Sequence, residues 1–148
     1  MNTAKHLNGS SSPLLPKRPF LFWNKKYLLV MVLVSLLGTM LDHIFVEKKY
    51  YEFPIRPLPQ YFSINIGFTF VVLPLFILFY LHMMKLINQW GKAGLILFIS
   101  LLMPIFEKIA ELCGLFAHSA NWNHLYTFFG YLVFLPLVYS FYHWVENK

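Results

Sequence analysis

The stretch AGLILFISLLMPIFEKIAELCGLF, residues 93–116, decides the fold. It is 24 residues long, and a helix rising ~1.5 Å per residue crosses a ~30 Å hydrocarbon layer in about 20 residues. Three more apolar blocks of similar length occur in the chain, so the sequence predicts four membrane spans, at about residues 27–45, 61–84, 93–116 and 125–145. We therefore predict an all-α, polytopic transmembrane bundle of four helices.

The composition supports a membrane location. Hydrophobic residues make up 58% of the chain and charged residues only 12%, whereas a soluble domain averages about 45–50% and about 25%. Because four short-linked helices leave no room for a second domain, residues 23–148 are predicted to form one four-span membrane domain. The Gly-, Ser- and Pro-rich residues 1–22 are predicted to be a disordered N-terminal tail.

The distribution of basic residues predicts the orientation. Five lysines and arginines precede or open the first span, two follow the second span, and Lys148 ends the chain, which makes eight. Only three, Lys48, Lys49 and Arg56, lie in the connections on the opposite side. Since cytoplasmic loops carry the excess of positive charge, we expect a multi-pass protein of the cell membrane with both termini cytoplasmic.

The net charge of +6 does not indicate nucleic-acid binding. Nucleic-acid surfaces need basic side chains gathered on a folded element, together with residues that read bases. Here the charge flanks the apolar blocks instead, as in membrane insertion signals. The partners we expect are the lipid bilayer and either another membrane protein or a second copy of this chain.

The third span contains the polar residues of greatest interest. At ~100° per residue, Glu107, Glu111 and His118 would fall within about 40° of one another on one helical face. Carboxylate and imidazole groups are ligands for a divalent transition metal. These three residues are therefore candidate metal ligands, although no established metal-binding motif surrounds them.

Other polar residues are expected at the same depth of the bundle. Asp42 and His43 close the first span, Asn65 opens the second, and Lys108 neighbours Glu107 in the third. Charged groups in hydrocarbon are costly and normally turn toward the bundle interior, where they pair. These residues predict a polar cluster in the external half. It could be a structural hydrogen-bonded network, a metal site or a proton relay.

The chain resembles an uncharacterised family of small multi-spanning membrane proteins from spore-forming Gram-positive bacteria. The resemblance covers roughly residues 24–145. It rests on Leu41-Asp42, Arg56-Pro57-Leu58-Pro59, Phe62-Ser63-Ile64-Asn65, Leu73-Pro74, the group Glu107, Glu111 and Gly114, and Trp122 before an aromatic last span. It implies a membrane location.

No established catalytic motif occurs in the sequence, and Cys113 is the only cysteine. We therefore favour a non-enzymatic membrane component that binds a small polar ligand or a partner protein. The alternative is a metal- or proton-coupled enzyme or transporter that uses the stripe of Glu107, Glu111 and His118.

Overall fold

The computed structural model describes residues 25–148, so the predicted N-terminal tail lies outside the described residues. Four long helical segments follow one another: α1 (Lys25–Glu47), the π-helical turn η2 (Phe68–Val72) continued by α2 (Leu73–Leu86), α3 (Gln89–Leu112) and α4 (His124–Glu146). All four are long and apolar enough to cross a membrane. The prediction of an all-α bundle with four transmembrane helices is confirmed.

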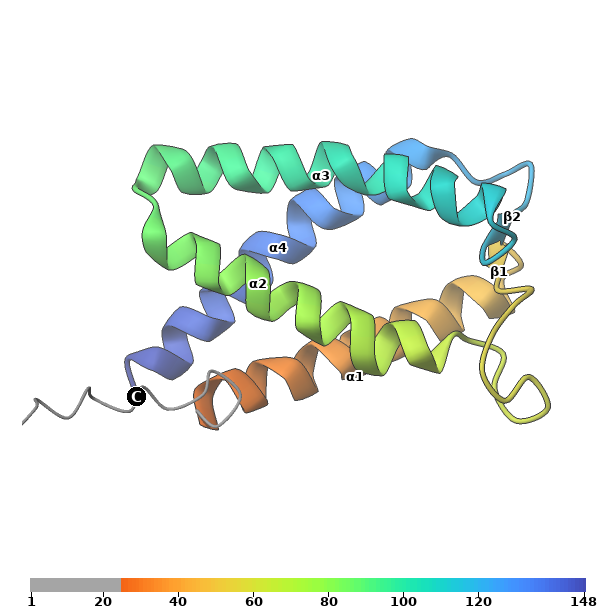
Figure 1. Ribbon diagram of the computed structural model, residues 1–148, viewed down its shortest axis with the longest axis horizontal. Coiled ribbons are helices and arrows are strands. Elements are labelled where there is room, and N and C mark those ends of the chain that lie inside the picture. The colour runs from red at the N-terminus through yellow and green to blue at the C-terminus, as the bar shows by residue number, and fades with distance from the viewer. Residues whose placement is uncertain (1–24) are drawn as a thin grey trace, which may run out of the picture.

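The two ends of the bundle differ (Figure 1). One end, here called the terminal end, holds the start of α1, the turn between α2 and α3, and the end of α4. There the Lys26 ammonium donates to the Glu146 carbonyl oxygen at 2.7 Å. The other end, here called the sheet end, holds two short antiparallel strands, β1 (Tyr51–Glu52) and β2 (Ala117–His118). Both described chain ends therefore lie at the same end of the bundle.

The main apolar core lies around α2. It is built from buried residues of all four helices, among them Val34, Ile77, Tyr80, Ile99 and Leu135. The outer faces of the helices are apolar as well and remain uncovered. A hydrocarbon layer would cover these faces without desolvating polar groups, which fits the membrane location.

The second helical segment begins later than the predicted residue 61. The side chain of Asn65 accepts a hydrogen bond from the Phe68 N–H at 3.1 Å, which caps the start of the helix. Just before it, Ile64 is buried in a small second core beside Tyr51 and Phe53 at the sheet end. The apolar residues before Asn65 thus help to close the end of the bundle instead of extending the span.

The π-helical turn η2 precedes Pro74. The Leu73 N–H donates to the Phe68 carbonyl oxygen, five residues back, so this turn is wider than an α-helical turn. Proline has no N–H to donate, and a widened turn is one way in which a helix accommodates that loss. The turn carries Thr69, whose side chain is fully buried against α1.

The third helix ends at Leu112, before the predicted residue 116. Gly114 adopts a left-handed conformation (φ +72°), its N–H donates to the Glu111 carbonyl, and the Leu115 N–H donates to the Ala110 carbonyl. This is the Schellman arrangement that stops helices at glycine. His118 consequently does not share a helical face with Glu107 and Glu111, as the sequence had predicted. It lies on β2, directly opposite Tyr51 of β1.

Candidate ligand-binding cavity and histidine cluster

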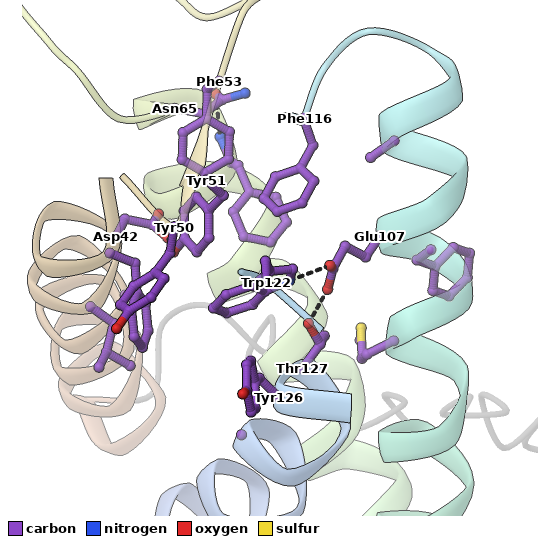
Figure 2. Close-up of a pocket in the computed structure, with 18 of the residues that line it drawn as sticks. Asp42, Tyr50, Tyr51, Phe53, Asn65, Glu107, Phe116, Trp122, Tyr126 and Thr127 are labelled. Atoms are coloured by element: carbon purple, nitrogen blue, oxygen red, sulfur yellow. Dashed lines mark hydrogen bonds between the residues drawn. The ribbon is translucent and has the colours of Figure 1, made fainter. Parts of the chain in front are cut away.

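A cavity of about 930 Å³ lies at the sheet end, and residues of all four helices and of both connections at that end line it. Aromatic side chains dominate its walls, including Phe45, Tyr51, Phe106, Trp122, Tyr126 and Tyr131. Two carboxylates, Asp42 on α1 and Glu107 on α3, enter the lining from different sides (Figure 2). A largely apolar hollow with few polar groups is the usual form of a small-molecule site.

Among the described residues 25–148, the groups that donate hydrogen bonds to Asp42 are neutral hydroxyls. The Tyr51 hydroxyl donates to Asp42 Oδ1 at 2.7 Å, and the Thr69 hydroxyl lies 3.2 Å from Oδ2. The Thr69 hydroxyl is also 3.0 Å from the Asn65 carbonyl oxygen, so its one proton serves two acceptors. Within residues 25–148, no cationic side chain forms an ion pair with Asp42. Within the described residues, the carboxyl group is therefore held in place by hydroxyl groups and not by an ion pair.

Tyr51 orients Asp42 from the connection that follows α1. Burial, reinforced by the neighbouring Asp42 carboxylate, raises the pKa of the Tyr51 phenol far above its usual range. The phenol therefore keeps its proton at physiological pH and remains a donor to Asp42. The Tyr51 ring packs against Phe116 and Trp122 at centroid distances of 5.0 and 5.2 Å, which fixes the position of the hydroxyl.

Glu107 accepts hydrogen bonds from three side chains, one more than Asp42. Its Oε1 accepts hydrogen bonds from Trp122 Nε1 at 2.7 Å and from His124 Nδ1 at 2.9 Å, and its Oε2 accepts one from the Thr127 hydroxyl. The Glu107 side chain is only 9% exposed. Three donors that follow β2 in the chain thus converge on one carboxylate of α3, and Figure 2 shows two of them, Trp122 and Thr127. Glu107 joins α3 to α4 and shapes the cavity wall.

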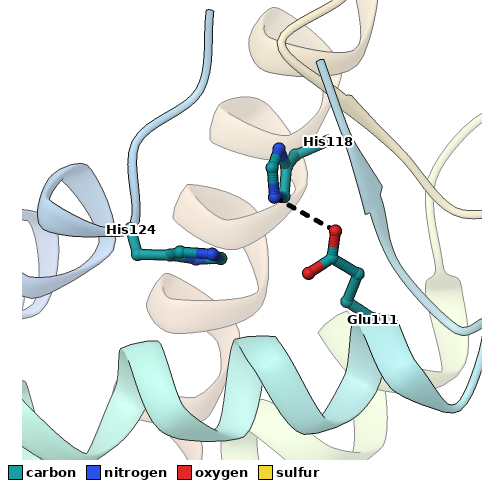
Figure 3. A group of neighbouring side chains, drawn as sticks. All are labelled: Glu111, His118 and His124. Carbon is teal, nitrogen blue, oxygen red and sulfur yellow. Dashed lines mark ion pairs between the residues drawn. The ribbon is translucent and has the colours of Figure 1, made fainter. Parts of the chain in front are cut away.

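A second polar cluster lies one helical turn further along α3 (Figure 3). Glu111 Oε1 is 3.1 Å from His118 Nε2, and its Oε2 is 2.5 Å from Lys108 Nζ. His124 joins the group, because each of Glu111, His118 and His124 offers a ligand atom and these atoms lie within 4.8 Å of one another. Each of the three side chains is half-buried. Residues of this type at such distances are able to hold a metal ion.

The structure distributes the predicted site residues over several places. Asp42, Asn65 and Glu107 line the cavity, with Asn65 also capping the second helical segment. Glu111 and His118 belong, with His124, to the second polar cluster, here called the histidine cluster. Lys108 contacts Glu111 from an exposed position. His43 is exposed on α1 and lines neither place.

Several site residues were not predicted from the sequence. His124, which precedes the last span, was expected at the depth of the polar cluster but was not a predicted metal ligand, and in the structure it bonds Glu107 and joins Glu111. Thr69 and Thr127 carry no sequence signal, since a threonine inside an apolar span is common and often bonds its own helix. The aromatic lining of the cavity could not be predicted either. Aromatic residues make up 20% of the whole chain, so their presence does not single out the ones that line a cavity.

The fold and the cavity define a class: a multi-pass membrane protein whose four apolar helices line an aromatic, carboxylate-containing cavity at one end. Comparison with protein-family models, with curated proteins and with solved structures gives no match to this chain. The resemblance to a family from spore-forming bacteria therefore stays a prediction.

Proposed function

We propose that this protein is a non-enzymatic membrane component that binds a small organic cation with an apolar body in its aromatic cavity. The observation that carries the proposal is the Asp42 carboxylate, which accepts from the Tyr51 and Thr69 hydroxyls, has no ion-pair partner within residues 25–148, and lines a cavity walled by aromatic rings. A cavity of about 930 Å³ is at the upper end of the size typical of small-ligand sites, about 300–1,000 Å³.

The chemistry of the walls favours a positively charged ligand. Aromatic faces attract cations, most strongly where water is excluded, and quaternary ammonium groups are commonly bound by cages of such rings. An ionised carboxylate inside a membrane protein is costly unless an opposite charge is close. A bound ammonium group would supply that charge to Asp42, while its alkyl chain would lie against the apolar rings.

Binding of hexyltrimethylammonium to the purified protein in an uncharged maltoside detergent tests this proposal. The measurement is the dissociation constant from isothermal titration calorimetry. We expect Asp42→Asn to weaken binding at least tenfold, because the amide keeps the shape and the hydrogen bond from Tyr51 but removes the charge. The neutral carbon isostere of the ligand should bind wild-type protein at least tenfold more weakly than the cation.

The matched control is Glu47→Gln, which removes an exposed carboxylate from the same helix without touching the cavity. Its affinity should equal that of the wild-type protein. Equal binding of the cation and its neutral isostere would contradict the proposed selectivity. Equal losses in Asp42→Asn and Glu47→Gln would show that the detergent surface, and not the cavity, attracts the cation.

We further propose that both termini are cytoplasmic and that the sheet end faces the exterior of the cell membrane. The excess of lysine and arginine at the terminal end supports this orientation. Single cysteines introduced at Asn147 and at Glu52 in a Cys113→Ser background test it in intact cells. A membrane-impermeant maleimide should label Glu52→Cys before lysis and Asn147→Cys only after lysis. The reverse pattern would invert the orientation.

A further inference from the structure

We propose that Glu111, His118 and His124 form a zinc site at the sheet end. This inference does not depend on cation binding in the cavity, because Asp42 takes no part in it. The three residues come from the end of α3, from β2 and from the start of α4, so a bound ion would tie together the three segments that close this end.

The geometry is close to that of a metal site. The ligand atoms of the three residues lie within 4.8 Å of one another, and the two imidazole rings stand almost perpendicular, 88° apart, with centroids separated by 5.0 Å. Zinc–nitrogen and zinc–oxygen bonds of about 2.0–2.2 Å in a tetrahedron put neighbouring ligand atoms about 3.4 Å apart. Side-chain rotations that move these atoms by about 1 Å would therefore bring them to the spacing of zinc ligands.

The hydrogen bonds of His118 leave one nitrogen for the metal. Its Nδ1 lies 3.0 Å from the Ser119 carbonyl oxygen, which can only accept, so Nδ1 carries a proton. Its Nε2 then faces Glu111 Oε1 at 3.1 Å. These two atoms come from β2 and from α3, and they lie close enough together for one metal ion to bind both after small side-chain movements.

His124 is arranged in the same way. Its Nδ1 lies 2.9 Å from Glu107 Oε1, which leaves Nε2 as the atom free for coordination. A carboxylate that accepts from the remote N–H of a metal-bound histidine fixes the ring and increases its basicity. On Glu111, Lys108 holds Oε2 and leaves Oε1 toward the histidines. All three candidate ligands thus already have supporting partners.

The donor set selects the type of ion. Two imidazole nitrogens and one carboxylate oxygen suit zinc, whereas calcium and magnesium prefer oxygen ligands throughout. Three protein ligands leave a fourth position for water. A smaller cavity of about 450 Å³ borders His118 and Ser119 and provides room for solvent beside the site.

Zinc titration of the purified full-length protein, carrying a tag without histidine and stripped with a chelator, tests the inference. We expect one zinc per chain with a dissociation constant in the micromolar range or below. Glu111→Gln, His118→Gln and His124→Gln should each weaken binding at least tenfold. Glu107→Gln should weaken it about 10- to 100-fold through His124, as is usual for partners of metal ligands.

The matched controls are His82→Gln and His143→Gln, which remove exposed histidines of α2 and α4 away from the site and should leave zinc affinity unchanged. The X-ray absorption spectrum of the zinc-loaded wild-type protein is independent of whether the variants fold. It should show two imidazole ligands. Absence of zinc binding, or affinity retained in both His118→Gln and His124→Gln, would overturn the site. The contact of Glu111 with His118 would then only hold α3 against β2.

Discussion

Replacing Glu107 by leucine is expected to lower the free energy of unfolding of the bundle by about 2–4 kcal/mol. The side chain is 9% exposed and accepts from Trp122, His124 and Thr127. Leucine fills a similar volume but accepts nothing, so three donors at the sheet end would lose their partner together. Each buried donor left unpaired costs about 1–3 kcal/mol. Reversible unfolding in mixed micelles of maltoside and dodecyl sulfate measures the change.

Two variants separate the causes of this effect. Glu107→Gln keeps one acceptor oxygen and should retain part of the stability, so its loss should lie between wild type and Glu107→Leu. Glu47→Leu changes an exposed carboxylate at the end of α1 and should stay within about 0.5 kcal/mol of wild type. If Glu107→Leu were as stable as Glu47→Leu, the three hydrogen bonds would not hold the sheet end together.

Replacing Tyr80 by alanine is expected to lower the free energy of unfolding by about 3 kcal/mol. Large-to-small changes at buried aromatic positions typically cost about 3–5 kcal/mol. We expect the lower end of this range because helices in a membrane are held together mainly by packing and not by the hydrophobic effect. The Tyr80 ring on α2 is fully buried among the helices, and its hydroxyl donates to the Leu135 carbonyl oxygen of α4 at 3.1 Å. Removing the ring leaves a void beside the most buried of the four spans. The same unfolding assay measures it.

Tyr80→Phe divides this effect into packing and hydrogen bonding. It keeps the ring and should cost about 1 kcal/mol, the typical net value of one hydrogen bond. Phe79→Ala is the matched control, because Phe79 is the preceding residue of the same helix and is 62% exposed on the outer face. Phe79→Ala should lower the free energy of unfolding much less than Tyr80→Ala does. Equal losses at the two positions would mean that α2 is not the central helix of the core.

The spans were predictable because their signal is local. The first predicted span, residues 27–45, is long enough for the hydrocarbon layer, and its middle, residues 28–41, carries no charge, whatever the rest of the chain does. The ends of the helices were less predictable, because single residues decide them. Asn65 caps the second segment and Gly114 stops α3, each in the middle of apolar sequence that would otherwise continue a helix.

Part of the candidate site was predictable for a similar reason. A carboxylate such as Asp42 or Glu107 in an apolar span must turn inward, so the sequence alone predicted that both would meet polar partners in the interior. Which partners they meet depends on the packing. Glu107 and Glu111 lie four residues apart on α3 but bond different groups, because β2 and the start of α4 approach them at different heights.

The sequence by itself determined the membrane location, the number of spans and the identity of the rare ionisable groups inside them, since all three follow from transferring each segment from water to lipid. Only the tertiary structure decided that Asp42 lines an aromatic cavity beside the Tyr51 and Thr69 hydroxyls, and that His118 and His124 meet at Glu111. Side-chain contacts between segments far apart in the chain depend on how the helices cross and on where the connections return, and no local pattern of residues encodes that geometry.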